Sequence, residues 1–161
     1  MNLHIPPAPL NISRKDMPQI QAKDVDEFLN VLRRKGIRLD RERVEVGTLK
    51  PTQSEFNHDK VKGMMKFDLS KSKPIIISMD NYIMDGHHRW LADLNKNRHL
   101  KIDTIRVHLK IMDLIQEAKS FDKVFYKKIH EQQAVKTIKR VITETYEYTN
   151  FLNNHKVIGK K

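Results

Sequence analysis

The 161-residue sequence contains no cysteine, which excludes disulfide bonds, thiolate metal ligands and cysteine nucleophiles. This absence also suits a reducing cytoplasm. Long hydrophobic runs are missing as well, because no segment approaches the ~18–20 uninterrupted apolar residues of a membrane-spanning helix. Residues 1–10 hold three prolines and no basic stretch, which argues against a secretory signal. We therefore expect a cytoplasmic protein without a membrane partner.

The chain is strongly basic: 31 lysines and arginines stand against 20 acidic residues, which gives a formal net charge of +11 and a pI near 9.8. Such a charge favours an anionic partner, for example nucleic acid, a nucleotide or an acidic surface. The alternative is a basic surface that serves only solubility. Hydrophobic residues make up 39% of the chain, which is enough for a folded core.

The apolar spacing predicts an α/β fold of the mixed α+β kind, organised as one domain with extensions. We divide it into an N-terminal arm and helix over 1–40, a core over 41–112, and a helical C-terminal extension with a basic tail over 113–161. The expected helices cover 24–35, a segment capped by Asn57 or Asp59, a segment that begins at His87, and a helical stretch from 113 to about 151. The expected extended segments are an arm over 1–20 and strands over 44–46, 74–79, 82–84 and 105–111, with a turn at 49–55 and a hairpin turn at 80–81.

The most informative motif is Asp85-Gly86-His87-His88-Arg89, at a predicted strand-to-helix junction. Glycine lets the backbone approach a ligand closely, and a helix start directs unpaired amides and a positive dipole end to the same place. Arginine can grip phosphate oxygens through two parallel hydrogen bonds. The motif therefore predicts a pocket for a di- or triphosphate. The alternative is an ordinary turn with two surface histidines and a solvated arginine.

The run from Asp85 to Ala92 resembles the phosphate motif of the ParB/sulfiredoxin superfamily, and its Asp-Gly-His-His-Arg form resembles the free-serine kinases of that superfamily. The segment 49–53 resembles the Pro-x-Gln stretch upstream of the first helix in ParB domains. The element order of the superfamily is matched over 44–111, and short stand-alone versions of the domain resemble bacteriophage proteins. The chain departs from sulfiredoxin at His87, where that enzyme needs a cysteine, so sulfiredoxin activity is excluded. No helix-turn-helix signal follows the core, so a full ParB protein is not expected.

The resemblance implies phosphoryl transfer from ATP or ADP, with Mg²⁺, to a small hydroxyl acceptor such as serine. Gln53, the Gly86 backbone, His87, His88 and Arg89 would hold phosphates, and His87 would also help to neutralise the transferring group. The candidate base is Glu55, for which a first-turn helix acid is the alternative interpretation. The remaining candidate, Asp85, would position Mg²⁺ or orient a histidine, or is simply a turn residue.

Other interpretations stay open at this point. A ParB-like DNA-associated protein, or one labelled a nuclease, would use nucleotide as a switch or not at all, and a host cytoplasm would apply if the chain is phage-encoded. No dedicated metal site is expected, because adjacent His87 and His88 point about 100° apart on a helix. Trp90 and Tyr82 could stack a base, but core positions are favoured. The basic residues from Lys123 onward could track a phosphate backbone, or form a solvated or partner-binding helix face. The oligomeric state is not predicted.

Overall fold

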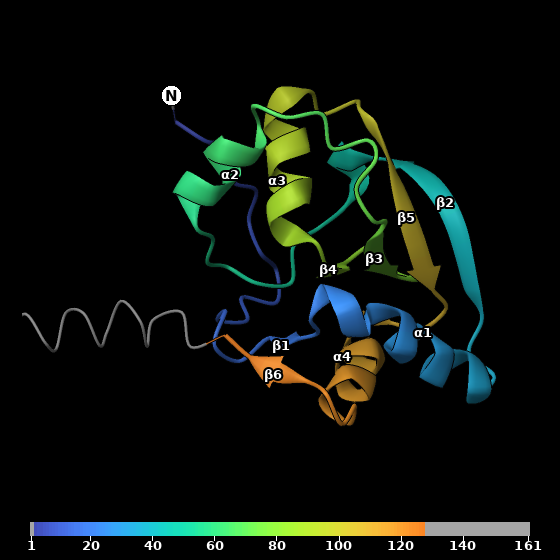
Figure 1. Cartoon of the computed structure of the whole chain (residues 1–161). Helices are drawn as coiled ribbons and strands as arrows, with labels where there is room; N and C mark the ends of the chain where they lie inside the picture. Colours follow the sequence, from blue (N-terminus) through green and yellow to red (C-terminus); the bar gives the residue numbers. More distant parts are fainter. Residues whose placement is uncertain (1, 128–161) are drawn as a thin grey trace, which may run out of the picture. The chain divides into compact units, whose positions relative to one another are not determined.

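The computed structural model describes residues 2–127, which form an α+β fold (Figure 1). Its main sheet has four strands in the order β2-β5-β3-β4. β3 pairs in parallel with β5, and the other two pairings are antiparallel. The strands are β2 (Leu39–Glu45), β3 (Ile75–Ser78), β4 (Ile83–Asp85) and β5 (Lys101–Val107). A separate two-stranded sheet pairs β1 (Pro18–Gln19) with β6 (Phe125–Tyr126).

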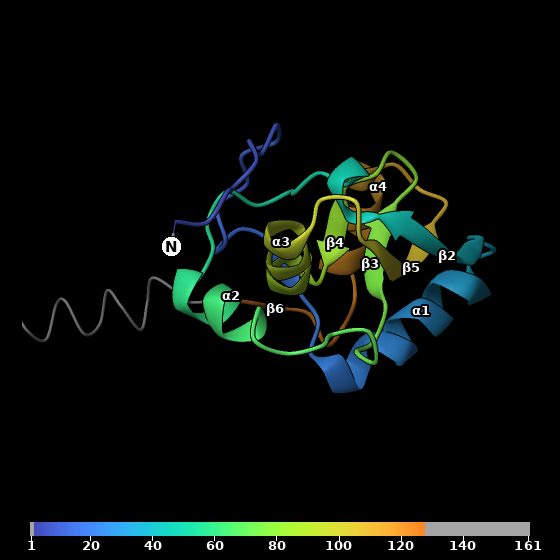
Figure 2. The ribbon, with the colours of Figure 1, turned by 90° about the horizontal axis from the view of Figure 1, so that it is seen from above.

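Helices cover both faces of the four-stranded sheet (Figures 1 and 2). They are α1 (Val25–Arg34), α2 (His58–Met64), α3 (His87–Lys96) and α4 (Ile111–Lys119), with short 3-10 turns at Ala22–Asp24 and Val46–Thr48. Side chains alternate across a strand, so β3 serves both layers. Ile76 packs with the apolar faces of α1 and α4, whereas Ile75 and Ile77 pack with α3. This double burial explains the continuous apolar run of β3.

Several expected elements are confirmed by local chemistry. Asn57 caps α2, because its side-chain oxygen accepts a hydrogen bond from the Lys60 amide at 3.0 Å. The hairpin turn at 80–81 joins β3 to β4, and Asn81 adopts the left-handed conformation with φ 68°. α1 ends just before Gly36, which has φ 83°. Trp90 is fully buried and donates its indole N–H to the Val46 carbonyl at 3.1 Å, so its core position is confirmed.

Three predicted boundaries are wrong. The strand expected at 44–46 is β2, which runs from Leu39 to Glu45 and pairs along its whole length with β5. The charged residues at its start do not have the apolar pattern by which a strand is predicted. The strand expected at 105–111 spans Lys101–Val107, because the apolar alternation continues past the last sheet pairing into α4. The helical stretch expected from 113 is interrupted, since α4 ends at Lys119 and β6 follows. The part of that prediction over 128–151 lies outside the described residues.

The N-terminal arm is not extended throughout, because it bends in turns at 8–11 and 13–17. It also gains a strand through tertiary pairing. Pro18 and Gln19 have no strand signal of their own and become β1 by pairing with Tyr126 and Phe125. Within residues 2–127, no helix is long and apolar enough to cross a membrane.

Candidate functional site

The start of α3 is built by Gly86, which occupies the N-cap with φ 101°. The left-handed region is nearly free of cost only for glycine. A Cβ added there would lie 2.9 Å from Cγ1 of Ile75, so the space is closed as well. The first amide bonded inside the helix belongs to Trp90, which donates to the Gly86 carbonyl at 2.9 Å. The three preceding amides, those of His87 to Arg89, therefore precede the helix hydrogen-bond ladder and can serve an anion.

Gly86 and the three residues that follow it line a cavity of about 500 Å³, which we call the phosphate cavity after the ligand that the sequence predicts. Its walls come from the N-terminal arm, Gln53, α2, the loop before β3, the start of α3 and the segment after β6. Its lining within residues 2–127 includes five lysine and arginine side chains but one carboxyl group, that of Asp85. The cations are Arg14, Lys60, Lys73, Arg89 and Lys127. This excess of positive charge, converging on the helix start from five parts of the chain, attracts an anion of high charge.

Arg14, Lys60 and Lys73 are cations of this cavity that sequence reasoning missed, and Arg14 is the most buried of the three. Its residue is only 4% exposed, and it lines the phosphate cavity from the N-terminal arm. Within residues 2–127 its guanidinium has neither a hydrogen bond nor an ion pair, whereas its backbone amide donates to a Glu55 carboxylate oxygen at 2.9 Å. Burial lowers the pKa of Arg14, and the negative charge of Glu55 opposes that shift. Buried arginine without a partner is costly, so its position points to an anionic ligand.

The two histidines of the motif hold the site together through their Nε2 atoms. Nε2 of His87 accepts from the Thr52 amide at 3.1 Å and lies 2.9 Å from the Thr52 hydroxyl, which donates to the Ile83 carbonyl. Nε2 of His88 accepts from the Asn57 amide at 3.1 Å. An amide can only donate, so both imidazoles are neutral in this arrangement and carry their proton on Nδ1. They therefore position the helix start and leave the positive charge to lysine and arginine.

Burial is the main reason that the pKa values of His87 and His88 are both lowered to about 3. For His88 the charges of Arg14, Lys60 and Lys127 add to the effect. Such a histidine is protonated in the unfolded chain near its ordinary value of 6.5 but not in the folded chain. We expect the free energy of unfolding to fall as the pH falls from about 6.5 to 3, by up to roughly 2 kcal/mol per histidine at pH 5. Thermal unfolding across this window measures the fall.

The matched variant for this prediction is His88→Gln, whose amide oxygen can accept the Asn57 N–H without titrating. Its unfolding free energy should depend less steeply on pH between 6.5 and 3 than that of the wild type. The raised pKa values of Asp85 and Asp93 act in the opposite direction in both proteins, because they favour proton uptake by the folded chain. Equal slopes for the two proteins would show that His88 is not held neutral.

The structure brings most of the predicted site residues together, with one exception. Gln53 is buried and lines the phosphate cavity, with its amide N–H₂ donating to the Glu55 carbonyl at 2.9 Å. Asp85 lines the same cavity, and burial raises its pKa against the nearby charges of Arg89, Lys127 and Lys60. Glu55 is not among the lining residues, and its carboxylate binds the arm at the Arg14 amide. The carboxyl group nearest the predicted phosphate residues is therefore that of Asp85, and a catalytic role for Glu55 stays a prediction.

Two further predicted features have their place in the described part of the chain. Lys50 lies with its Nζ atom 4.2 Å from the centre of the Tyr82 ring, so this ring already has a cationic neighbour. Lys123 forms an ion pair with Glu27 at 2.5 Å. The basic residues from Lys128 onward lie outside the described residues. No group of three histidine, aspartate or glutamate side chains that could hold a metal ion occurs within residues 2–127.

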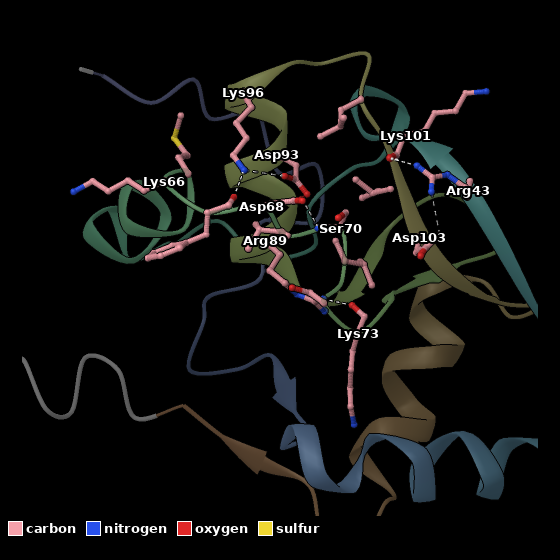
Figure 3. Close-up of a pocket in the computed structure, with 17 residues that line it drawn as sticks. Arg43, Lys66, Asp68, Ser70, Lys73, Arg89, Asp93, Lys96, Lys101 and Asp103 are labelled. Atoms are coloured by element: carbon pink, nitrogen blue, oxygen red, sulfur yellow. Dashed lines mark hydrogen bonds and ion pairs between the residues drawn. The ribbon is translucent and has the colours of Figure 1, made fainter.

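A second cavity of about 390 Å³ lies on the other side of Arg89 (Figure 3). It shares Ser72, Lys73 and Arg89 with the phosphate cavity. At this common wall the Arg89 guanidinium donates to the Lys73 carbonyl. Sequence reasoning gave no sign of this cavity, because its lining comes from segments that are distant along the chain.

The fold and the site together define a class: an α+β domain with a cationic cavity at a glycine-capped helix start. No family model, curated protein or solved structure matches the chain. Function is therefore inferred from the site itself.

Proposed function

We propose that this protein binds a nucleotide through its phosphates and transfers a phosphoryl group to a small hydroxyl-bearing acceptor. The observation that carries the proposal is the phosphate cavity, where five cationic side chains and three helix-start amides surround a single carboxyl group. The buried guanidinium of Arg14 needs a negative partner that no residue from 2 to 127 supplies at ion-pair distance. A di- or triphosphate offers enough charge and enough acceptor oxygens to satisfy this set of donors.

The resemblance to the ParB/sulfiredoxin superfamily supports the same function. The chain has the expected succession of a strand, a Pro-x-Gln turn, a helix, a strand pair, the Gly-x-x-Arg motif and a helix, in β2, residues 49–55, α2, β3 with β4, and α3. The motif lies at the point where β4 meets α3, and Gln53 lies at the same cavity. We therefore propose membership of this superfamily together with the activity that its serine-kinase branch implies.

In the proposed reaction the acceptor hydroxyl oxygen forms a bond to the terminal phosphorus while the bond from that phosphorus to its bridging oxygen breaks. The shortened nucleotide leaves with the bonding electrons, and Asp85 takes the acceptor proton. A raised pKa makes this carboxylate a stronger base than an exposed aspartate. Arg14, Arg89 and Lys60 neutralise the phosphate charge. Mg²⁺ that enters with the nucleotide would be held by phosphate oxygens and water, because the cavity offers one carboxylate, and it would neutralise further charge.

Calorimetric titration tests the binding step. We expect the wild type to bind ATP, ADP, CTP or GTP with Mg²⁺, and to bind tripolyphosphate as well. Arg89→Ala should weaken all of these, because the variant lacks the guanidinium that faces the cavity. A free ligand concentration of 100 times the dissociation constant should raise the free energy of unfolding by about 2.7 kcal/mol, and thermal unfolding would detect this increase. A wild type that binds none of these ligands would contradict the proposal.

Transfer of the labelled terminal phosphate to serine and other small alcohols tests the chemical step. Asp85→Asn should retain nucleotide binding and lower the transfer rate by at least about 100-fold, because an amide cannot accept the proton. Glu55→Gln serves as the comparison, since its carboxylate binds the arm and does not line the cavity. Transfer that survives in Asp85→Asn and is lost in Glu55→Gln would assign the base to Glu55.

A further inference from the structure

The second cavity differs in chemistry from the phosphate cavity. Its floor and walls include six apolar side chains, from the segment after α2, from β3, and from the start of β5. They are Met65, Phe67, Leu69, Ile75, Leu100 and Ile102. Charged residues line the cavity as well, and Figure 3 shows Lys96 and Asp93 on α3, with Arg43 on β2 and Lys101 on β5. The other eleven lining residues are polar or charged. A small organic molecule that carries both an apolar ring and polar groups fits such a mixed lining, and 390 Å³ lies in the usual size range of ligand pockets.

Phe67 gives this cavity an aromatic surface that the fold does not use. Phe67 is 66% exposed, and it is the one aromatic residue among the described residues that line this cavity. The loop that carries Phe67 is fixed at its backbone, because the Phe67 carbonyl accepts a hydrogen bond from the Lys96 ammonium. An exposed phenylalanine that lines the second cavity is a suitable surface for stacking a planar heterocycle.

Asp93 supplies a hydrogen-bond acceptor in the same cavity. Its residue is 7% exposed, and its carboxylate lies 3.8 Å from the Lys96 ammonium, which is longer than a direct hydrogen bond. Burial raises the pKa of Asp93, and the charges of Lys96 and Arg89 oppose that shift. A buried carboxylate with remaining acceptor capacity can bind a sugar hydroxyl or the amino group of a base.

The two cavities meet at Lys73 and Arg89. A molecule with a phosphate chain at one end and an uncharged ring at the other would fit the pair better than either cavity alone. The cations of the phosphate cavity suit the phosphates, and the six apolar side chains of the second cavity suit the ring. The acceptor is a weaker match to the second cavity, because a small polar alcohol gains little from six apolar side chains.

We propose that the second cavity holds the base and sugar of the nucleotide whose phosphates occupy the phosphate cavity, with the base stacked on Phe67 and Asp93 as a polar partner. This inference rests on the proposed function and extends it to a second set of residues. The shared residues Lys73 and Arg89 lie where the sugar joins the phosphates. The proposal predicts that base-dependent and phosphate-dependent binding can be separated by mutation.

The test compares ATP–Mg²⁺, CTP–Mg²⁺ and tripolyphosphate as ligands of the full chain by calorimetric titration. Phe67→Ala should weaken the better-bound nucleotide about tenfold, the size of a lost base–aromatic stack, and leave tripolyphosphate binding unchanged. Phe67→Tyr should restore nucleotide binding because it restores the ring. The matched control is Met112→Ala on α4, which removes a side chain of similar exposure, 58%, that lines neither cavity.

The outcomes separate this inference from the proposed function. Nucleotide and tripolyphosphate binding that both survive in Phe67→Ala would place the base elsewhere and overturn the inference, while the phosphate site would stand. Equal loss of both ligands in Phe67→Ala would also overturn it, because the residue would then act on the phosphate cavity. A wild type that binds tripolyphosphate as tightly as any nucleotide would show that no base is held. A wild type that binds none of the three would overturn both proposals.

Discussion

Arg14→Met is expected to weaken nucleotide–Mg²⁺ and tripolyphosphate binding by about 30- to 4,000-fold, which corresponds to about 2–5 kcal/mol. The reason is that the Arg14 guanidinium is buried at the phosphate cavity and forms no ion pair with any residue from 2 to 127. Phosphate oxygens would complete its charge-assisted hydrogen bonds in a poorly solvated place. Methionine keeps an unbranched apolar stem, is shorter than arginine and removes the charge. Calorimetric titration of both ligands measures the loss.

The same substitution should not destabilise the free protein. Removing an unpaired buried charge is favourable, so we expect the free energy of unfolding to rise by about 1 kcal/mol or stay unchanged in urea titrations. The control is Arg41→Met on β2, where the side chain is 70% exposed and lies 3.6 Å from Asp103. That variant should retain full binding. A destabilised Arg14→Met protein with normal ligand affinity would mean that Arg14 has a structural role.

Gly86→Ala should lower the free energy of unfolding by roughly 2–4 kcal/mol, through two separate costs. A non-glycine residue at φ 101° pays about 1 kcal/mol or more in backbone energy. The new Cβ would also meet Ile75 Cγ1 at 2.9 Å and Arg89 Nη2 at 3.3 Å, and overpacking of this kind costs typically 1–3 kcal/mol. Ile75 belongs to the buried strand β3 and cannot move away freely. Urea titration measures the loss, and the melting temperature should fall by roughly 4–16 °C.

Two other glycines separate these costs. Gly36 has φ 83° and open space where an added methyl group would lie, so Gly36→Ala should lose only about 1 kcal/mol of backbone energy. Gly63 lies inside α2 with open space and no positive φ, so Gly63→Ala should be neutral or stabilise by up to about 1 kcal/mol. The expected order of stability is therefore Gly63→Ala, then Gly36→Ala, then Gly86→Ala. A Gly86→Ala loss no larger than that of Gly36→Ala would mean that the contact with Ile75 relaxes.

The sequence was most informative where structure depends on neighbours along the chain. Gly86 before a helical pattern predicted the start of α3, and Asn57 predicted the cap of α2. The buried strand β3 followed from an apolar, β-branched run. The predicted length of β2 was too short, because its charged residues have little strand propensity of their own. They form a strand because they pair with β5. Strand pairing depends on a partner from elsewhere in the chain, which a local pattern does not contain.

The candidate site divides in the same way. The strand-to-helix junction at residues 85–89 could be predicted without coordinates, because a glycine, a helical pattern and Arg89 are close together in the chain. Tertiary packing was needed to show that Arg14 and Lys127 join them, since the pairing of β1 with β6 brings the segments that carry these two residues together. It was also needed to show that the histidines are neutral, because their Nε2 atoms accept amides of Thr52 and Asn57. Burial and charge clustering are properties of the folded surface, so they arise only once distant segments have packed together.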